Sequence, residues 1–287
     1  MAFLDQHPGL GYPLASGLGL LLGSFLNVVI LRLPRRLEWQ WKRDAREILE
    51  MPDIYDPPPP GIVVEPSHDP VTGDRLKWWE NIPVLSWLLL RGRSRYSGKS
   101  ISLQYPLVEL LTCLLVLASV WRFGFGWHGF GAIVFSCFLV ALAGIDLRTR
   151  LLPDQLTLML MWLGLIGSAD NLFMAAKPAL LGAAVGYLSL WIVAALFKLI
   201  FNKEGMGHGD FKMLGALGAW CGLKGILPII LISSLAGVVL GSVWLVVRGH
   251  NRTMMIPFGP YLAVGGWIVF FFGDQIIHAY LELLSIG

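Results

Sequence analysis

The sequence predicts an all-α polytopic membrane protein, with about eight transmembrane helices and one large cytoplasmic loop domain between the first two. Of its 287 residues, 55% are hydrophobic and only 14% are charged, and the mean hydropathy is +0.65. A soluble domain carries about 25% charged residues. Long apolar runs follow one another after residue 103, each able to cross roughly 30 Å of hydrocarbon as a helix. The sequence lacks the alternating pattern of a membrane β-barrel, which leaves helices.

The predicted helices divide the chain into three parts. Residues 1–33 hold the first transmembrane helix, residues 34–103 form the loop domain, and residues 104–287 form the transmembrane core. A short helix rich in Gly and Ala is typical of a re-entrant or partly buried segment, and the sixth helix fits that description. The eight predicted helices cover residues 10–32, 104–121, 129–146, 155–168, 177–200, 210–222, 225–247 and 258–282.

The distribution of basic residues orients these helices. Residues 1–9 contain no Lys or Arg, and the apolar stretch at 10–33 is too long for a signal-peptide core, so we expect it to remain as a membrane span. Placing the 34–103 loop in the cytoplasm puts all but three of the 22 Lys and Arg residues on that side; the others are Arg122, Lys177 and Lys224. The positive-inside rule therefore predicts an outside N-terminus.

The 34–103 segment has the composition of a small domain at the membrane surface. It opens with a basic, Trp-containing stretch able to form an amphipathic helix, and the prolines at 57–60 then break helical structure. Trp78, Trp79 and Trp87 follow, and tryptophan is enriched at the level of lipid headgroups. We therefore expect the loop to dock on the membrane.

Two aspartates are the first candidates for chemistry. Asp146 ends one predicted helix and Asp210 begins another, and the topology places both at the cytoplasmic membrane surface. A carboxylate within the membrane is costly, so its presence indicates a function. Two carboxyl groups sharing a site do not both ionise easily, so one can activate water while the other polarises a carbonyl group. The alternative is an acidic helix cap, because Asp is common there.

The glycines before Asp210 favour the catalytic interpretation. Gly205, Gly207 and Gly209 alternate along the chain, which predicts a sharp turn and close approach to a substrate backbone. Gly207 and Gly209 are therefore candidate supporting residues. The alternative is a flexible loop that leads into a capped helix.

The segment GMGHGDFKMLGALGAW at 205–220 resembles the GxGD signature of type IV prepilin peptidases, which are membrane aspartic proteases. Five further segments resemble the same family in the same order; they lie at 23–34, 80–93, 101–112, 145–158 and 256–263. The resemblance implies that Asp146 and Asp210 are the catalytic pair. Asp154, after Pro153, is interpreted as a helix cap.

The loop departs from the family pattern. Members carry two CxxC pairs there, which resemble a four-thiolate zinc site, but this chain has no cysteine before Cys113, and Ser94 and Ser97 replace the second pair. Serine is a poor zinc ligand and His68 is the loop's only histidine, so no metal is expected. Cys113, Cys137 and Cys221 are interpreted as small buried apolar residues.

The resemblance also implies methylation of the new N-terminus, with S-adenosylmethionine as the cofactor. Glu80, Asn81 and Gly92 fall in the matching loop segments and are candidate residues for this step. The sequence contains no Gly-rich fingerprint of Rossmann type. Glu80 and Asn81 are equally suited to cap a short helix that Gly92 would end.

Several other polar residues near these motifs have two interpretations. Glu109 would either reach the membrane surface, with a part in substrate contact, or bond to a neighbouring helix. Lys212 is a candidate ion-pair partner of Asp210, and His208 is interpreted as a loop histidine rather than a proton shuttle. Pro257, Gly259 and Pro260 are expected to shape the start of the last helix rather than to touch substrate.

The expected function is removal of the short basic leader of type IV prepilins and type II secretion pseudopilins at the cytoplasmic face of a bacterial inner membrane. N-methylation would follow. The expected partners are these precursors and the lipid bilayer, with no nucleic acid. The alternatives are a peptidase that lost methylation with its cysteines, a non-catalytic assembly scaffold, and a proton- or cation-coupled transporter, whose sites would lie nearer the membrane midplane.

Overall fold

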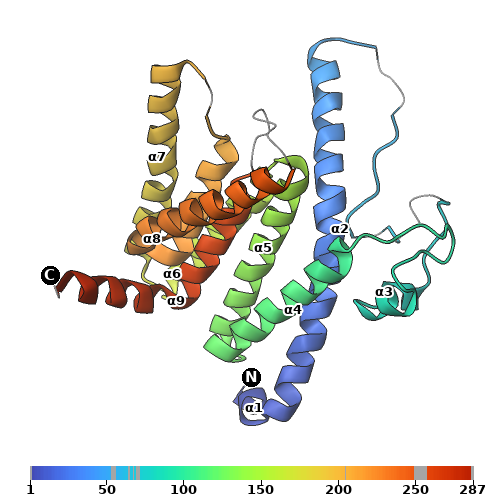
Figure 1. Ribbon diagram of the computed structural model, residues 1–287, viewed down its shortest axis with the longest axis horizontal. Helices are drawn as coiled ribbons and strands as arrows, with labels where there is room; N and C mark the ends of the chain where they lie inside the picture. The colour runs from blue at the N-terminus through green and yellow to red at the C-terminus, as the bar shows by residue number, and fades with distance from the viewer. Residues whose placement is uncertain are drawn as a thin grey trace. The chain divides into compact units, whose positions relative to one another are not determined.

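A computed structural model describes residues 2–52, 56–63, 65–66, 68, 72–203, 205–248 and 257–285. Its elements are α1 (Ala2–Gln6), α2 (Pro8–Ile48), η1 (Trp78–Asn81), α3 (Leu85–Leu89), α4 (Gln104–Phe123), α5 (Trp127–Thr149), α6 (Asp154–Ala169), α7 (Ala176–Phe201), α8 (His208–Arg248) and α9 (Gly259–Ser285) (Figure 1). Within these residues there is no strand, and two isolated β-bridges join His68 to Arg75 and Arg93 to Ser100.

The helices confirm an all-α polytopic membrane protein. In the described part of the chain, six helices are long and apolar enough to cross a membrane, namely α2, α4, α5, α7, the 208–239 part of α8, and α9. The number of crossings stays a prediction. The chain divides into two compact units, Met1–Ala141 and Leu142–Gly287, which are described separately below.

In the first unit, α2 packs against α4 at intervals of one helical turn. A β-carbon on Gly19 would lie 2.7 Å from Cys113 Cα, and one on Gly23 would lie 2.6 Å from Glu109 Cα. One turn further along α2, the amide Nδ2 of Asn27 donates to the Tyr105 carbonyl at 3.0 Å. The small residues therefore let the two backbones approach, as is common between membrane helices.

Helix α2 runs well beyond the predicted end at residue 32. It continues through Pro34 to Ile48, so the expected amphipathic segment extends the same helix. An interior proline costs about 3 kcal/mol, and contacts with the returning chain offset part of that cost. The Arg32 guanidinium donates to the carbonyls of Gly61 (2.6 Å) and Glu65 (2.9 Å), and Trp39 Nε1 donates to the Asp56 carbonyl at 3.0 Å.

In the second unit, α8 is the central helix and packs against α6, α7 and α9. A β-carbon on Gly182 of α7 would lie 2.3 Å from the Gly218 carbonyl oxygen of α8, so only glycine permits this crossing. Gly222 has φ 70° and ψ 179°, which breaks α8 into two helical segments. These segments correspond to the two helices predicted at 210–222 and 225–247.

Candidate active site

Asp146 lies in the last turn of α5 and is 5% exposed. Its Oδ2 accepts a hydrogen bond from the backbone N–H of Gly259, the first residue of α9, at 2.9 Å. A β-carbon on Gly259 would lie 2.7 Å from that oxygen. The absence of a side chain at residue 259 is therefore what lets the start of α9 donate to the carboxylate.

Asp210 is the third residue of α8, and its carboxyl group lies close enough to that of Asp146 for the two charges to interact. The backbone N–H of Asp210 donates to the Gly207 carbonyl at 3.2 Å. Arg150 also interacts electrostatically with Asp146. The structure thus places the two aspartates, which lie 64 residues apart in the sequence, near enough for their charges to interact.

The glycines before Asp210 serve close packing rather than a left-handed turn, because Gly205, Gly207 and Gly209 do not have positive φ. A β-carbon on Gly209 would lie 2.7 Å from Leu152 Cβ, and one on Gly205 would lie 2.7 Å from the Phe197 ring. At Gly207 it would meet only Asp210 Oδ2, at 3.6 Å, among the atoms described. Gly207 therefore leaves the approach to Asp210 open.

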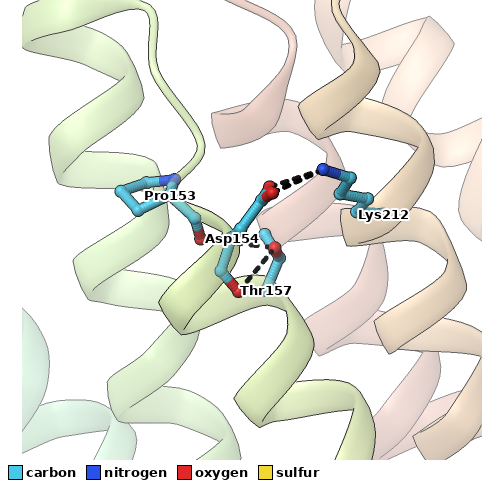
Figure 2. A network of polar contacts seen from close by, with 4 residues as sticks. All are labelled: Pro153, Asp154, Thr157 and Lys212. Atoms are coloured by element: carbon cyan, nitrogen blue, oxygen red, sulfur yellow. Dashed lines mark hydrogen bonds and ion pairs between the residues drawn. The ribbon is translucent and has the colours of Figure 1, made fainter. Parts of the chain in front are cut away.

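Lys212 pairs with Asp154, so the suggested ion pair with Asp210 is wrong. Its Nζ lies 2.7 Å from both carboxylate oxygens of Asp154 (Figure 2). Residues two apart on a helix point in different directions, which explains why Lys212 reaches α6 instead. Asp154 is the first residue of α6 and Pro153 holds the N-cap position, so Asp154 is not the cap itself.

Glu80 is the buried carboxylate of the loop, 7% exposed. Its Oε2 accepts hydrogen bonds from the Lys77 N–H (2.7 Å) and the Tyr96 hydroxyl (3.0 Å), while its Oε1 is buried and has no hydrogen-bond partner among the described residues. Desolvation and the hydrogen bond to Glu80 raise the pKa of the Tyr96 phenol above its ordinary value. Glu80 also closes the capping box of η1, and the helix ends at Asn81.

Gly92 completes the turn that ends α3. Its N–H donates to the Trp87 carbonyl (2.9 Å) and the Arg91 N–H donates to the Leu88 carbonyl (3.1 Å), which is a Schellman motif. Gly92 has φ +68°, and a β-carbon there would lie 2.9 Å from the Trp87 ring. The helix-ending interpretation of Gly92 is confirmed.

Ser94 organises the turn where the family carries its second cysteine pair. Its hydroxyl oxygen accepts the backbone N–H groups of Tyr96 (3.2 Å) and Ser97 (3.4 Å). The described residues contain no group of three His, Cys, Asp or Glu side chains placed to hold a metal. Trp79 lies under Arg95 and Trp87 Nε1 donates to the Ile101 carbonyl, so both tryptophans have partners within the loop.

Glu109 joins the loop to the membrane helices, as its bonding interpretation predicted. It is 7% exposed, and its Oε2 accepts the Val84 N–H at 2.7 Å. The Ser24 hydroxyl of α2 also hydrogen-bonds to it. Val84 has φ 58°, which is unusual for a β-branched residue, so the carboxylate stabilises an otherwise unfavourable backbone just before α3.

The contact between Gly259 and Asp146 was missed by sequence reasoning, which assigned Gly259 only to the helix start. The one available signal was the position of this glycine between Phe258 and Pro260 in the segment PFGP, at a predicted helix start on the cytoplasmic side. His208 is exposed and its ring lies 5.5 Å from that of Phe211; it is the first residue of α8 rather than a loop residue.

Comparisons with known proteins agree with this geometry. Residues 18–123 match the bacterial peptidase A24 N-terminal domain, and residues 133–242 match the type IV leader peptidase family. A prepilin leader peptidase/N-methyltransferase of Xanthomonas campestris pv. campestris is 77% identical over 286 residues, covering 100% of both chains. Proteins of the same name from Stutzerimonas stutzeri and Pseudomonas aeruginosa are each 47% identical, and the matches cover 98% of this chain and 97% of each relative. No solved structure matches. The chain belongs to the type IV leader peptidase family.

Proposed function

We propose that this chain removes the leader peptide of type IV prepilins and then N-methylates the new N-terminal residue. The observation that carries the proposal is the convergence of Asp146 and Asp210 in a chain that is 77% identical, end to end, to a prepilin leader peptidase/N-methyltransferase. Pseudopilins of type II secretion are further substrates in this proposal. The site faces the cytoplasm at a bacterial inner membrane, with the N-terminus outside.

Cleavage would use the two aspartates in complementary roles. The ionised carboxyl group takes a proton from water as it attacks the scissile carbonyl, while the protonated one donates to the carbonyl oxygen. The tetrahedral intermediate then collapses: the C–N bond breaks, the first carboxyl group gives its proton to the leaving amine, and the second takes its proton back as the C=O bond re-forms. Gly259 N–H holds Asp146 in place, and the open backbone at Gly207 admits the extended substrate. The substrate's apolar helix would pack against the enzyme within the bilayer.

Methylation would use the loop. S-adenosylmethionine supplies the methyl group when bound, and the residues proposed to hold it are Glu80, Asn81 and Gly92. The buried Oε1 of Glu80 has no hydrogen-bond partner in the described part of the chain, so the carboxylate has capacity to accept a donor from a bound cofactor. The turn at Gly92 brings the backbone close to the Trp87 ring and orders the C-terminal end of the loop segment that begins at Glu80.

Mass spectrometry tests both activities at once. The purified full-length enzyme is incubated with a prepilin, with and without S-adenosylmethionine, and the products are weighed. We expect loss of the leader in both reactions and one added methyl group only with the cofactor. An unchanged precursor would contradict the peptidase, whereas a cleaved but unmethylated product would favour the peptidase-only alternative.

We expect neither activity to need a metal. The Ser94 hydroxyl organises the turn with two backbone hydrogen bonds, and the Tyr96–Glu80 bond links the two halves of the loop. Prolonged chelation should therefore leave the melting temperature and the cleavage rate unchanged. Elemental analysis should give far less than one zinc per chain, and a stoichiometric zinc ion lost together with activity would contradict this prediction.

Substitution of Gly92 should separate the two activities. Gly92→Ala places a methyl group against the Trp87 ring in a left-handed conformation, so we expect methylation of a pre-cleaved pilin to fall at least about tenfold, while cleavage changes less than about twofold. Gly98→Ala is the matched control, because Gly98 has φ +67° but no atom within 4 Å of an added β-carbon. Equal loss of both activities in Gly92→Ala would indicate one shared site or a misfolded loop.

A further inference from the structure

The ion pair between Lys212 and Asp154 joins the second turn of α8, close to Asp210, to the first residue of α6. Lys212 Nζ contacts both oxygens of Asp154 at 2.7 Å, and the side chains are 28% and 58% exposed (Figure 2). Lys212 lies two residues after Asp210 and is the fifth residue of α8. The Thr157 hydroxyl, one turn into α6, donates to the Pro153 carbonyl at 3.3 Å and steadies the helix start that presents Asp154.

Lys212 lies near the N-terminal end of α8, which is not a favourable place for a cation. The partial positive charge at a helix N-terminus favours Asp and falls off within the first turn, so at the fifth residue it opposes Lys212 only weakly. Asp154 stands in the favourable position at the start of α6 and supplies the compensating charge. Because exposed ion pairs contribute only about 0–1 kcal/mol to stability, stability alone gives little reason for this arrangement.

The charge of Lys212 lies within electrostatic reach of the aspartates. Two helical residues on opposite sides of the helix place their charged groups about 10 Å apart. At that distance, an unpaired charge at the protein surface would move a titration by roughly 0.3–1 pH unit. A neutral pair acts as a dipole, whose field is much weaker.

We propose that Asp154 is a positioning residue of the peptidase, which holds the Lys212 ammonium in a neutral ion pair so that its charge does not act on Asp146 and Asp210. The proposal rests on the proposed catalytic role of those two aspartates. In this proposal Asp154 controls the pH range in which the enzyme works and does not touch the substrate.

The helix ends that are close in sequence to Asp146 and Asp210 carry further charged groups. Helix α5 ends with Arg148 and Arg150, and Arg150 interacts with Asp146. Helix α7 carries Lys198 near its end, with Lys203 just beyond it, and α8 begins with His208. The described start of α9, residues 257–260, contains no charged side chain. All of these groups stay in place when only Asp154 and Lys212 are changed.

The test compares pH profiles of kcat for leader removal by the full-length enzyme at low ionic strength. Asp154→Asn leaves the Lys212 ammonium unpaired, and this charge favours ionised carboxylates. The acidic and alkaline limbs of the pH profile should therefore both move to lower pH by roughly 0.3–1 unit. Lys212→Gln leaves an unpaired anion and should move both limbs to higher pH by a similar amount. The double variant carries neither charge and should return to the wild-type profile.

Two controls separate electrostatics from folding. The shifts should shrink in about 0.5 M salt, where screening is strong, and Asp154→Glu, which keeps the charge, should retain the wild-type profile. A mainly structural pair would lower kcat at every pH without moving the limbs, and the double variant would be no better than the single ones. That result would overturn this proposal and leave the aspartate pair intact, whereas active Asp146→Asn and Asp210→Asn enzymes would overturn the proposed function itself.

Discussion

Asp146→Asn and Asp210→Asn should each lower the rate of leader removal by at least about 10³-fold while the protein remains folded in the membrane. Asparagine preserves shape and one oxygen, but it cannot exchange the proton that acid–base catalysis requires. The two carboxyl groups lie close enough to interact, so neither can substitute for the other's role. The measurement is single-turnover cleavage of a purified prepilin by detergent-solubilised enzyme.

The matched control is Asp154→Asn, at a carboxylate only eight residues after Asp146. The Asp154 side chain pairs with Lys212 and is 58% exposed. It should retain substantial cleavage at its own pH optimum. A fully active Asp146→Asn enzyme together with an inactive Asp154→Asn enzyme would mean that the catalytic pair is misassigned.

Gly259→Val should be the most damaging change outside the aspartates, with kcat for cleavage reduced roughly 100-fold. A β-carbon at residue 259 would lie 2.7 Å from Asp146 Oδ2 and 3.1 Å from Leu152 Cδ2. The carboxylate must therefore move, and a displacement of about 1 Å at a reacting group can cost about 10² in rate. Valine keeps the backbone N–H, so lost activity would report displacement rather than a missing donor.

Gly273→Val on the same helix is the comparison, because a β-carbon there would meet only Val269 Cγ1, at an ordinary 3.5 Å. It should keep near-wild-type cleavage. Melting temperatures of both variants distinguish a local effect from unfolding. If Gly259→Val cleaved at the wild-type rate, the contact between α9 and Asp146 would have no part in catalysis.

The apolar runs were sufficient to predict the helices, because lipid leaves the backbone no alternative to internal hydrogen bonding. The aspartates were singled out by the resemblance of their segments to the peptidase family, because an Asp at a helix end could equally have been a cap. The end of α2 was not predictable. Pro34 and the basic residues after it indicated a boundary, but contacts of Arg32 and Trp39 with residues 56–65 support a continuous helix. These contacts depend on a chain that returns only in the folded protein.

The sequence by itself thus determined the membrane fold, since hydrophobic length needs no knowledge of neighbours, and its resemblance to the family singled out the two aspartates. Only the tertiary structure decided which groups surround those aspartates. Gly259 donates to Asp146 across 113 positions of sequence, and Lys212 pairs with Asp154 across 58 positions. The partner of each polar side chain depends on which helix ends meet and on how each helix is rotated about its own axis. The packing of α8 against α6, α7 and α9 sets both, through close contacts such as that between Gly182 and Gly218.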